Sequence, residues 1–177
     1  MTALLDATLV GEVGAYPPQG AVGDRILVLG VGNLLMGDEG VGVHILRRLE
    51  HGVPVPGVRL LDGGTGGINL LGEFEGAHDI VLIDATRDGR PAGTIAFLQP
   101  VSVGELPRGL GAHDFGLKDL FAVAALVGQM PRIHLYTIAV EEVRPMCTKL
   151  SPAVAAAMPE VVRAVRALVT TLAAQSI

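Results

Sequence analysis

The chain contains very little cysteine and very few aromatic residues. Cys147 is the single cysteine among 177 residues, so an internal disulfide framework is excluded, and we expect a reducing, cytoplasmic compartment. Tryptophan is absent and aromatic residues make up 3% of the chain, whereas half of all residues are hydrophobic. The core must therefore consist mainly of aliphatic side chains, a composition that suits a largely parallel sheet covered on both faces.

Positive charge is also scarce. Lys118 and Lys149 are the two lysines, the arginines are scattered, and the formal net charge is −5. A nucleic-acid partner is not expected, because binding phosphates requires clustered basic residues. No apolar run reaches about 18 residues, so no membrane-spanning segment is expected either. The length fits one domain, which we expect to be monomeric.

The first 24 residues differ from the rest of the chain. They contain Asp6 and Glu12 but no basic residue, which is not typical of a secretory signal. Pro17 and Pro18, followed by Gln-Gly, indicate a loop. We expect residues 1–24 to form a flexible extension and residues 25–177 to form one α/β domain.

Apolar runs and helical periodicity alternate after residue 24. Strands are expected at 26–29, 58–61, 80–83, 94–98 and 133–140. Helices are expected at 39–50, 68–74, 117–125 and 152–174, the last with Ser151 as N-cap. This order predicts a three-layer α/β/α sandwich with a mostly parallel five-stranded sheet.

One strand is expected to be antiparallel. The connection between strands 80–83 and 94–98 is too short for a parallel crossover, so the second strand should pair antiparallel with the first. Arg87, Asp88 and Arg90 would then form a solvated hairpin tip.

Residues 26–42 are the most informative stretch. A strand leads through two glycines to two acids, Asp38 and Glu39, just before a helix. Many α/β proteins place glycines here so that a helix N-terminus can receive a phosphate, but carboxylates would repel a pyrophosphate and attract a cation. Leu35 also stands where the third glycine of the dinucleotide-binding fingerprint belongs. A metal or a peptide substrate is favoured, and a Rossmann-like nucleotide-binding protein is the weaker alternative.

Three polar residues are expected at the carboxyl ends of strands, where α/β proteins bind ligands. Glu39 follows the first strand, Asp84 follows the third, and His113 lies in the long loop after the fourth. Two carboxylates and an imidazole suit a borderline divalent ion such as nickel or zinc. Three protein ligands would leave coordination positions open for a substrate.

The motifs resemble those of a known family. Residues 30–42, Gly-Val-Gly-Asn-Leu-Leu-Met-Gly-Asp-Glu-Gly-Val-Gly, resemble the opening signature of the hydrogenase maturation endopeptidases. The resemblance continues at residues 62–67, Asp-Gly-Gly-Thr-Gly-Gly, at Asp84-Ala85, and at His113 before Gly116-Leu117. It implies an endopeptidase that removes the C-terminal extension of a nickel-iron hydrogenase large-subunit precursor after nickel insertion.

The resemblance also implies roles for individual residues. Those matching Glu39, Asp84 and His113 form the nickel-directed site of the family, with nickel expected to arrive on the substrate's cysteine thiolates. Other divalent ions could occupy the same site. An aspartic-type endopeptidase is expected, with Asp38 and Asp84 as candidate catalytic carboxylates. The loop matching the substrate-recognition loop contains Asp62, Gly63, Gly64 and Thr65.

Simpler structural roles stay open for the same residues. Asp38 is suited to capping the following helix, and Glu39 to interacting with the helix macrodipole. Asp84 would also fit as a solvated turn residue, and residues 62–67 as a strand-to-helix turn. The other histidines are assigned no role: His44, His51, His78 and His134.

Two further functions are alternatives to the endopeptidase. A non-proteolytic nickel-sensing chaperone of the same precursor fits the same motifs. A cysteine hydrolase using Cys147 is weaker, because the sequence indicates no partner for the thiol and Cys147 is more typical of a small buried hydrophobe.

Overall fold

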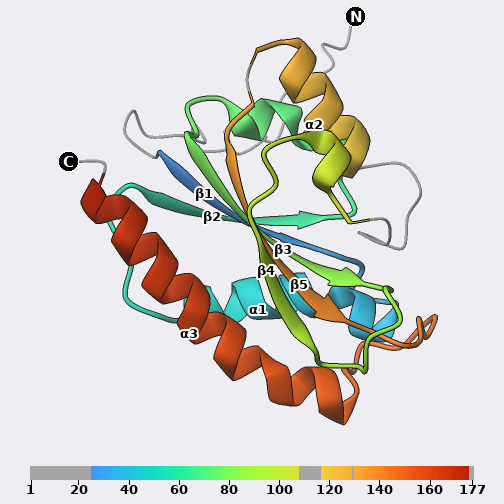
Figure 1. Ribbon diagram of the computed structural model, residues 1–177. Coiled ribbons are helices and arrows are strands. Elements are labelled where there is room, and N and C mark those ends of the chain that lie inside the picture. Colours follow the sequence, from blue (N-terminus) through green and yellow to red (C-terminus); the bar gives the residue numbers. More distant parts are fainter. Residues whose placement is uncertain (1–24, 108–116, 129, 176–177) are drawn as a thin grey trace, which may run out of the picture.

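The computed structural model describes residues 25–107, 117–128 and 130–175 of the chain (Figure 1). The expected N-terminal extension, residues 1–24, and the candidate ligand His113 lie outside the described residues. None of the described helices is long and apolar enough to cross a membrane.

A five-stranded sheet forms the centre of the fold. Its strands are β1 (Ile26–Val31), β2 (Val58–Gly64), β3 (Asp79–Thr86), β4 (Ile95–Leu98) and β5 (Arg132–Ala139). They lie in the order β2-β1-β3-β5-β4, and only the pairing of β4 with β5 is antiparallel among the described strands. The predicted mostly parallel five-stranded sheet with one antiparallel strand is confirmed.

The predicted partner of β4 is wrong. Strand β4 does not pair with its predecessor β3, because β5 lies between them. Seven of the eight residues of β5 are buried, so this strand needs a neighbour on each side, whereas Phe97 and Leu98 of β4 are partly exposed and suit a sheet edge. The segment between β3 and β4 therefore crosses the end of β5 and is not a hairpin tip.

Helices cover both faces of the sheet. On one face lie α1 (Val41–Glu50) and α3 (Pro152–Gln175). On the other face lie α2 (Leu117–Leu126) and the 3-10 helix η2 (Gly67–Phe74), and Figure 1 shows the sheet between these two layers. The short 3-10 helix η3 (Val103–Glu105) follows β4. The arrangement confirms the predicted three-layer sandwich.

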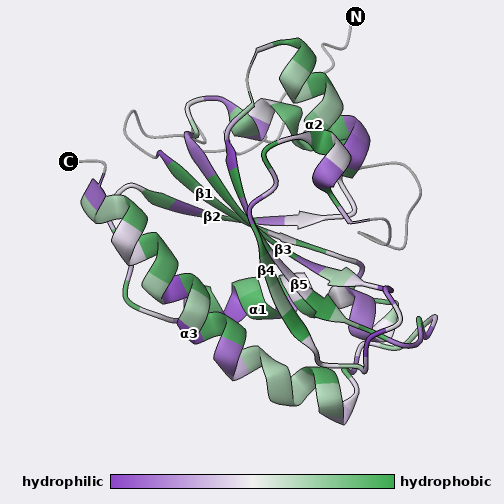
Figure 2. Ribbon diagram, viewed as in Figure 1, coloured by the Kyte–Doolittle hydropathy of each residue, from purple (hydrophilic) through white to green (hydrophobic). Residues whose placement is uncertain are grey.

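Each face of the sheet has its own hydrophobic core. Along β3 the side chains alternate, so that Val81, Ile83 and Ala85 pack toward α1 and α3. Ile80 and Leu82 pack toward α2 and η2. Figure 2 shows hydrophobic residues concentrated along the central strands. By the same alternation, Asp84 and Thr86 project from the α2 face at the end of the strand.

Two predicted helices differ from expectation: one α-helix begins later than predicted, and another segment forms a 3-10 helix. The segment from residue 39 starts as a 3-10 helix, η1 (Gly37–Gly40), and α1 begins only at Val41. Residues 67–74 also form a 3-10 helix rather than an α-helix. The expected cap of α3 is confirmed, because the Val154 N–H donates a hydrogen bond to Ser151 Oγ (3.4 Å).

Candidate functional site

The candidate site lies where the chain leaves β1 and β3 in different directions. From β1 the chain passes through α1 to β2, which lies on one side of β1. From β3 it continues to β4 and β5, which lie on the other side of the β1–β3 pair. In α/β proteins, ligands bind at the carboxyl ends of the strands on either side of such a switch point. Glu39 comes from the segment after β1, and Asp84 comes from the end of β3.

Two glycines allow the segment that carries Glu39 to pack directly on these strand ends. Gly32 has a φ of +136°, and a Cβ on it would lie 1.9 Å from the Glu39 carbonyl oxygen. A Cβ on Gly42 would lie 2.3 Å from the carbonyl oxygens of Ile83 and Val31. Because no larger side chain fits at either position, the glycines of the first motif bring η1 and α1 against β1 and β3.

Both candidate carboxylates are buried. Glu39 is 2% exposed and Asp84 is 0% exposed. The Ala85 N–H donates a hydrogen bond to Asp84 Oδ1 at 2.7 Å. The alternative of a solvated turn residue is therefore wrong for Asp84, which lies within β3 because that strand continues to Thr86. Buried carboxylates are uncommon and are paired or bind metal, so this pair is a candidate for function.

Asp38 does not cap the helix after it, so the capping role considered for it is wrong. The N-cap of α1 is Gly40, which has no side-chain cap hydrogen bond. Asp38 is 4% exposed, and its Oδ1 accepts a hydrogen bond from the Ser151 N–H at 2.5 Å and lies 4.0 Å from Arg144 Nη2. Its carboxylate therefore ties η1 to the start of α3.

The last residues of β2 and the loop that follows them lie beside the end of β1. The Gly32 N–H donates to the Gly64 carbonyl oxygen (2.9 Å), which joins this loop to the end of β1. The Asp62 carboxylate is 41% exposed, accepts the Gly64 N–H (3.0 Å) and lies 3.6 Å from Arg47 Nη2. Thr65 is exposed, whereas Gly63 is buried. Asp62 and Thr65 are thus accessible at the rim, and Gly63 is a packing residue.

The predicted metal ligands are only partly placed. The fold brings Glu39 and Asp84 to the carboxyl ends of β1 and β3, while His113 lies outside the described residues. Within the ranges that the structure describes, no three His, Cys, Asp or Glu side chains are grouped so as to hold a metal ion. The donor set predicted from the sequence, two carboxylates and an imidazole, therefore depends on His113 for completion.

Two threonines join Asp84 on the α2 face of the sheet, and the sequence reasoning missed both. Thr86 follows Asp84 by two positions on β3, and Thr137 is the residue of β5 that pairs with Asp84. Both threonines are 1% exposed. The period-two alternation of a strand could have identified Thr86, because residues i and i+2 share a face. Thr137 could be identified only from the strand pairing.

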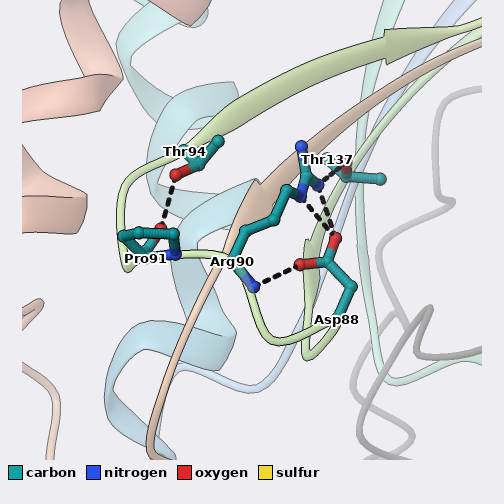
Figure 3. Close-up of polar contacts among 5 residues, drawn as sticks. All are labelled: Asp88, Arg90, Pro91, Thr94 and Thr137. Atoms are coloured by element: carbon teal, nitrogen blue, oxygen red, sulfur yellow. Dashed lines mark hydrogen bonds and ion pairs between the residues drawn. The ribbon is translucent and has the colours of Figure 1, made fainter.

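The segment between β3 and β4 contacts this polar group. Arg90 Nη2 lies 3.4 Å from Thr137 Oγ1, and Arg90 also forms an ion pair with Asp88 (2.5 Å; Figure 3). Farther along, Thr94 Oγ1 donates to the Pro91 carbonyl oxygen (2.6 Å). The segment expected to be a solvated hairpin tip therefore crosses the end of β5 and is held there by these contacts.

A second polar cluster lies at the opposite end of the strands, where β3 and β5 begin. Asp79 Oδ1 is 2.8 Å from His134 Nε2, and Asp79 Oδ2 accepts a hydrogen bond from Arg132 Nη2 at 2.7 Å. Burial alone would raise the pKa of the Asp79 carboxyl, but the bonds from Arg132 and His134 outweigh burial and hold that pKa below its usual range. The cluster joins the first residues of β3 and β5.

Cys147 is half-buried and is not part of the hydrophobic core. Its main chain joins the segment before η1, because Gly37 N–H donates to the Cys147 carbonyl oxygen (2.6 Å) and Cys147 N–H donates to the Leu35 carbonyl oxygen (3.1 Å). Its thiol lies 3.5 Å from the Lys149 carbonyl oxygen, which is not a base that could activate it. These contacts favour a structural role for Cys147.

Comparison with known proteins gives concordant matches. The family model described as hydrogenase maturation protease matches residues 43–168, a range that contains Asp62, Asp84 and His113 and begins just after Glu39. The hydrogenase expression/formation protein HupD of Thiocapsa roseopersicina is 43% identical over 125 residues, covering 67% of this chain and 55% of that protein. The chain thus spans about half the length of that relative.

Two matches that cover more of the matched protein agree. The hydrogenase 2 maturation protease of Escherichia coli is 38% identical over 111 residues, covering 61% of this chain and 68% of that protein. The structure of the hydrogenase maturating endopeptidase HybD from E. coli has a TM-score of 0.73 and 33% identity, covering 81% of this chain and 91% of that chain. On sequence and fold together, the chain belongs to the hydrogenase maturation protease family.

Proposed function

We propose that this protein is an endopeptidase that removes the C-terminal extension of a nickel-iron hydrogenase large-subunit precursor after nickel insertion. The observation that carries the proposal is the pair of buried carboxylates, Glu39 and Asp84, at the switch point between β1 and β3. In a chain of the hydrogenase maturation protease family, this switch point is the natural place for the reaction.

Nickel enters this proposal as part of the substrate. The precursor carries the ion on its cysteine thiolates, and Glu39, Asp84 and His113 complete the coordination. Carboxylate and imidazole donors suit nickel, and three protein ligands leave room for ligands from the precursor. Cleavage then depends on nickel insertion, because a precursor without the ion lacks the group that these side chains bind.

The reaction is hydrolysis of one peptide bond. A water molecule attacks the scissile carbonyl carbon, its proton passes to a general base, and the bond between carbon and nitrogen breaks as the proton reaches the departing amine. We assign the base to Asp84, which makes the enzyme aspartic in type. Asp38 is already held by Ser151 and Arg144, so we assign it a positioning role for the neighbouring Glu39.

Substrate contacts are assigned to the end of β2 and the loop that follows it. Asp62 and Thr65 are exposed near the end of β1, and Gly64 allows the main chain to turn between them. Gly63 is buried against Leu29 and Leu70, so its contribution is to packing. We further propose that the protein acts as a monomer in the cytoplasm, with the precursor as its partner.

Incubation of the purified protein with nickel-loaded and nickel-free precursor tests the proposal. The expected result is a large subunit shortened at its C-terminus, detected by mass spectrometry, in the nickel-loaded sample alone. A protein that holds the nickel-loaded precursor through co-purification without shortening it would support the nickel-sensing chaperone instead. Equal cleavage with and without nickel would contradict the nickel-directed role of Glu39, Asp84 and His113.

A further inference from the structure

Thr86 has a buried hydroxyl group that makes no hydrogen bond to any of the residues that the structure describes. The residue ends β3 and is 1% exposed, and in the described part of the chain no donor or acceptor is bonded to its Oγ1. Thr137 on the adjacent strand is equally buried, but its hydroxyl lies 3.4 Å from Arg90 Nη2. Burying a hydroxyl without a partner is unfavourable, so its presence in a native protein calls for a reason.

Thr86 follows Asp84 by two positions at the end of β3. The two residues share the α2 face of β3 by strand alternation. The pairing of β1 with β3 ends at Gly30 and Ile83, so residues 84–86 extend past the end of that ladder. Asp84 is equally buried, so a precursor segment that reaches Asp84 enters the part of the fold where Thr86 lies.

The hydroxyl supplies what the carboxylate beside it lacks. An ionised carboxylate accepts hydrogen bonds and donates none, and Asp84 Oδ1 already accepts one from the Ala85 N–H. An extended peptide presents carbonyl oxygens as well as N–H groups, and each carbonyl needs a donor when water is excluded. Resting on the proposed function, we propose that Thr86 Oγ1 donates a hydrogen bond to a main-chain carbonyl of the precursor segment that reaches Asp84.

The proposal makes Thr86 a substrate-binding residue with an unusual mutational signature. Thr86→Val keeps the shape of the side chain and removes the unpaired hydroxyl, so its melting temperature should equal or exceed that of the wild type. Cleavage of nickel-loaded precursor should fall about tenfold in kcat/KM, the scale of one lost hydrogen bond. Thr86→Ser, which keeps the donor, should restore most of the rate.

Thr137→Val is the matched control for stability. It removes a buried hydroxyl from the same face, but one that has a partner in Arg90, so its melting temperature should fall. Opposite signs for the two valine variants would show that the Thr86 hydroxyl is unsatisfied in the free protein.

The outcomes separate this inference from the proposed function. A Thr86→Val variant that cleaves as fast as the wild type would overturn the inference and leave the proposed function in place. A variant that loses stability and activity together would also overturn it, because the hydroxyl would then serve the fold. A wild-type protein that neither holds nor cleaves nickel-loaded precursor would overturn both.

Discussion

The Ser151 N–H donates a hydrogen bond to Asp38 Oδ1 at 2.5 Å, although the two residues are 113 positions apart in the sequence. Ser151 caps α3, and Asp38 immediately precedes Glu39 in η1. Because the carboxylate is buried, this bond fixes η1 relative to α3 and sets the position from which Glu39 extends. The candidate site is thus supported by a helix that contributes no candidate ligand.

Loss of the Asp38 carboxylate should destabilise the fold. Asp38→Ala leaves the Ser151 N–H without its acceptor and should lower the free energy of unfolding by about 1–3 kcal/mol in urea denaturation. Asp38→Asn keeps an acceptor oxygen and should lose less. Asp62→Ala, which removes a 41% exposed carboxylate, is the control and should cost less than about 1 kcal/mol. Equal losses for Asp38→Ala and Asp62→Ala would show that the hydrogen bond between Ser151 and Asp38 does not stabilise the position of η1 against α3.

Glu39→Gln should separate function from folding. The substitution keeps the size of the side chain but removes the charge that binds a divalent cation, so cleavage of nickel-loaded precursor should be abolished or slowed severely. The free energy of unfolding should change by less than about 1 kcal/mol, the scale of a helix-dipole interaction. Glu50→Gln, at the exposed far end of α1, is the control. Full cleavage by Glu39→Gln would remove Glu39 from the metal site.

Gly63 and Gly64, the last two residues of β2, should respond differently to alanine. A Cβ on Gly63 would lie 2.7 Å from Leu29 Cδ1, so Gly63→Ala should mainly reduce stability. Around Gly64 there is space, but its φ of +45° should make Gly64→Ala cost about 1 kcal/mol. If the loop binds the precursor, Gly64→Ala should also slow cleavage per folded molecule. Normal cleavage by this variant would leave the loop a purely structural turn.

The stability of the protein should depend on Asp79 at acid pH. Its pKa in the folded state lies below the ordinary value of an aspartic acid, so the ionised carboxylate stabilises the folded state at neutral pH. As the pH falls from about 5 toward 2, the unfolded state binds the proton first and this stability is lost. Asp79→Asn should therefore be less stable than the wild type at pH 7. Its melting temperature should also fall less steeply than that of the wild type as the pH is lowered from about 5 toward 2. The exposed Asp119→Asn variant should keep the wild-type profile.

Nickel binding by the isolated protein should be weak. Two carboxylates and one imidazole form an open set that lacks the thiolates of the precursor, and open sites hold metal less well than closed ones. Isothermal titration should give low affinity for the wild type and lower affinity still for His113→Ala. Tight stoichiometric binding that survives the loss of His113 would refute the assignment of this residue as a ligand.

Much of the fold could be predicted because its signals are local. Apolar runs located all five strands, and Ser151 with Pro152 located the start of α3. The antiparallel orientation of β4 also followed, since the connection is short. The strand that pairs with β4 could not be predicted, because the choice between β3 and β5 depends on how completely β5 must be buried. That requirement involves the whole sheet.

The amino-acid sequence by itself determined the family, the order of the elements and the positions of Glu39 and Asp84 near the ends of two predicted strands, because motif spacing and hydrophobic periodicity are properties of the chain. Only the tertiary structure decided that Asp38 binds Ser151 rather than capping α1, and that Thr86 is buried without a hydrogen-bond partner in the described residues. Both facts depend on which distant groups come within about 3 Å of an oxygen atom, and such contacts leave no mark in local sequence pattern.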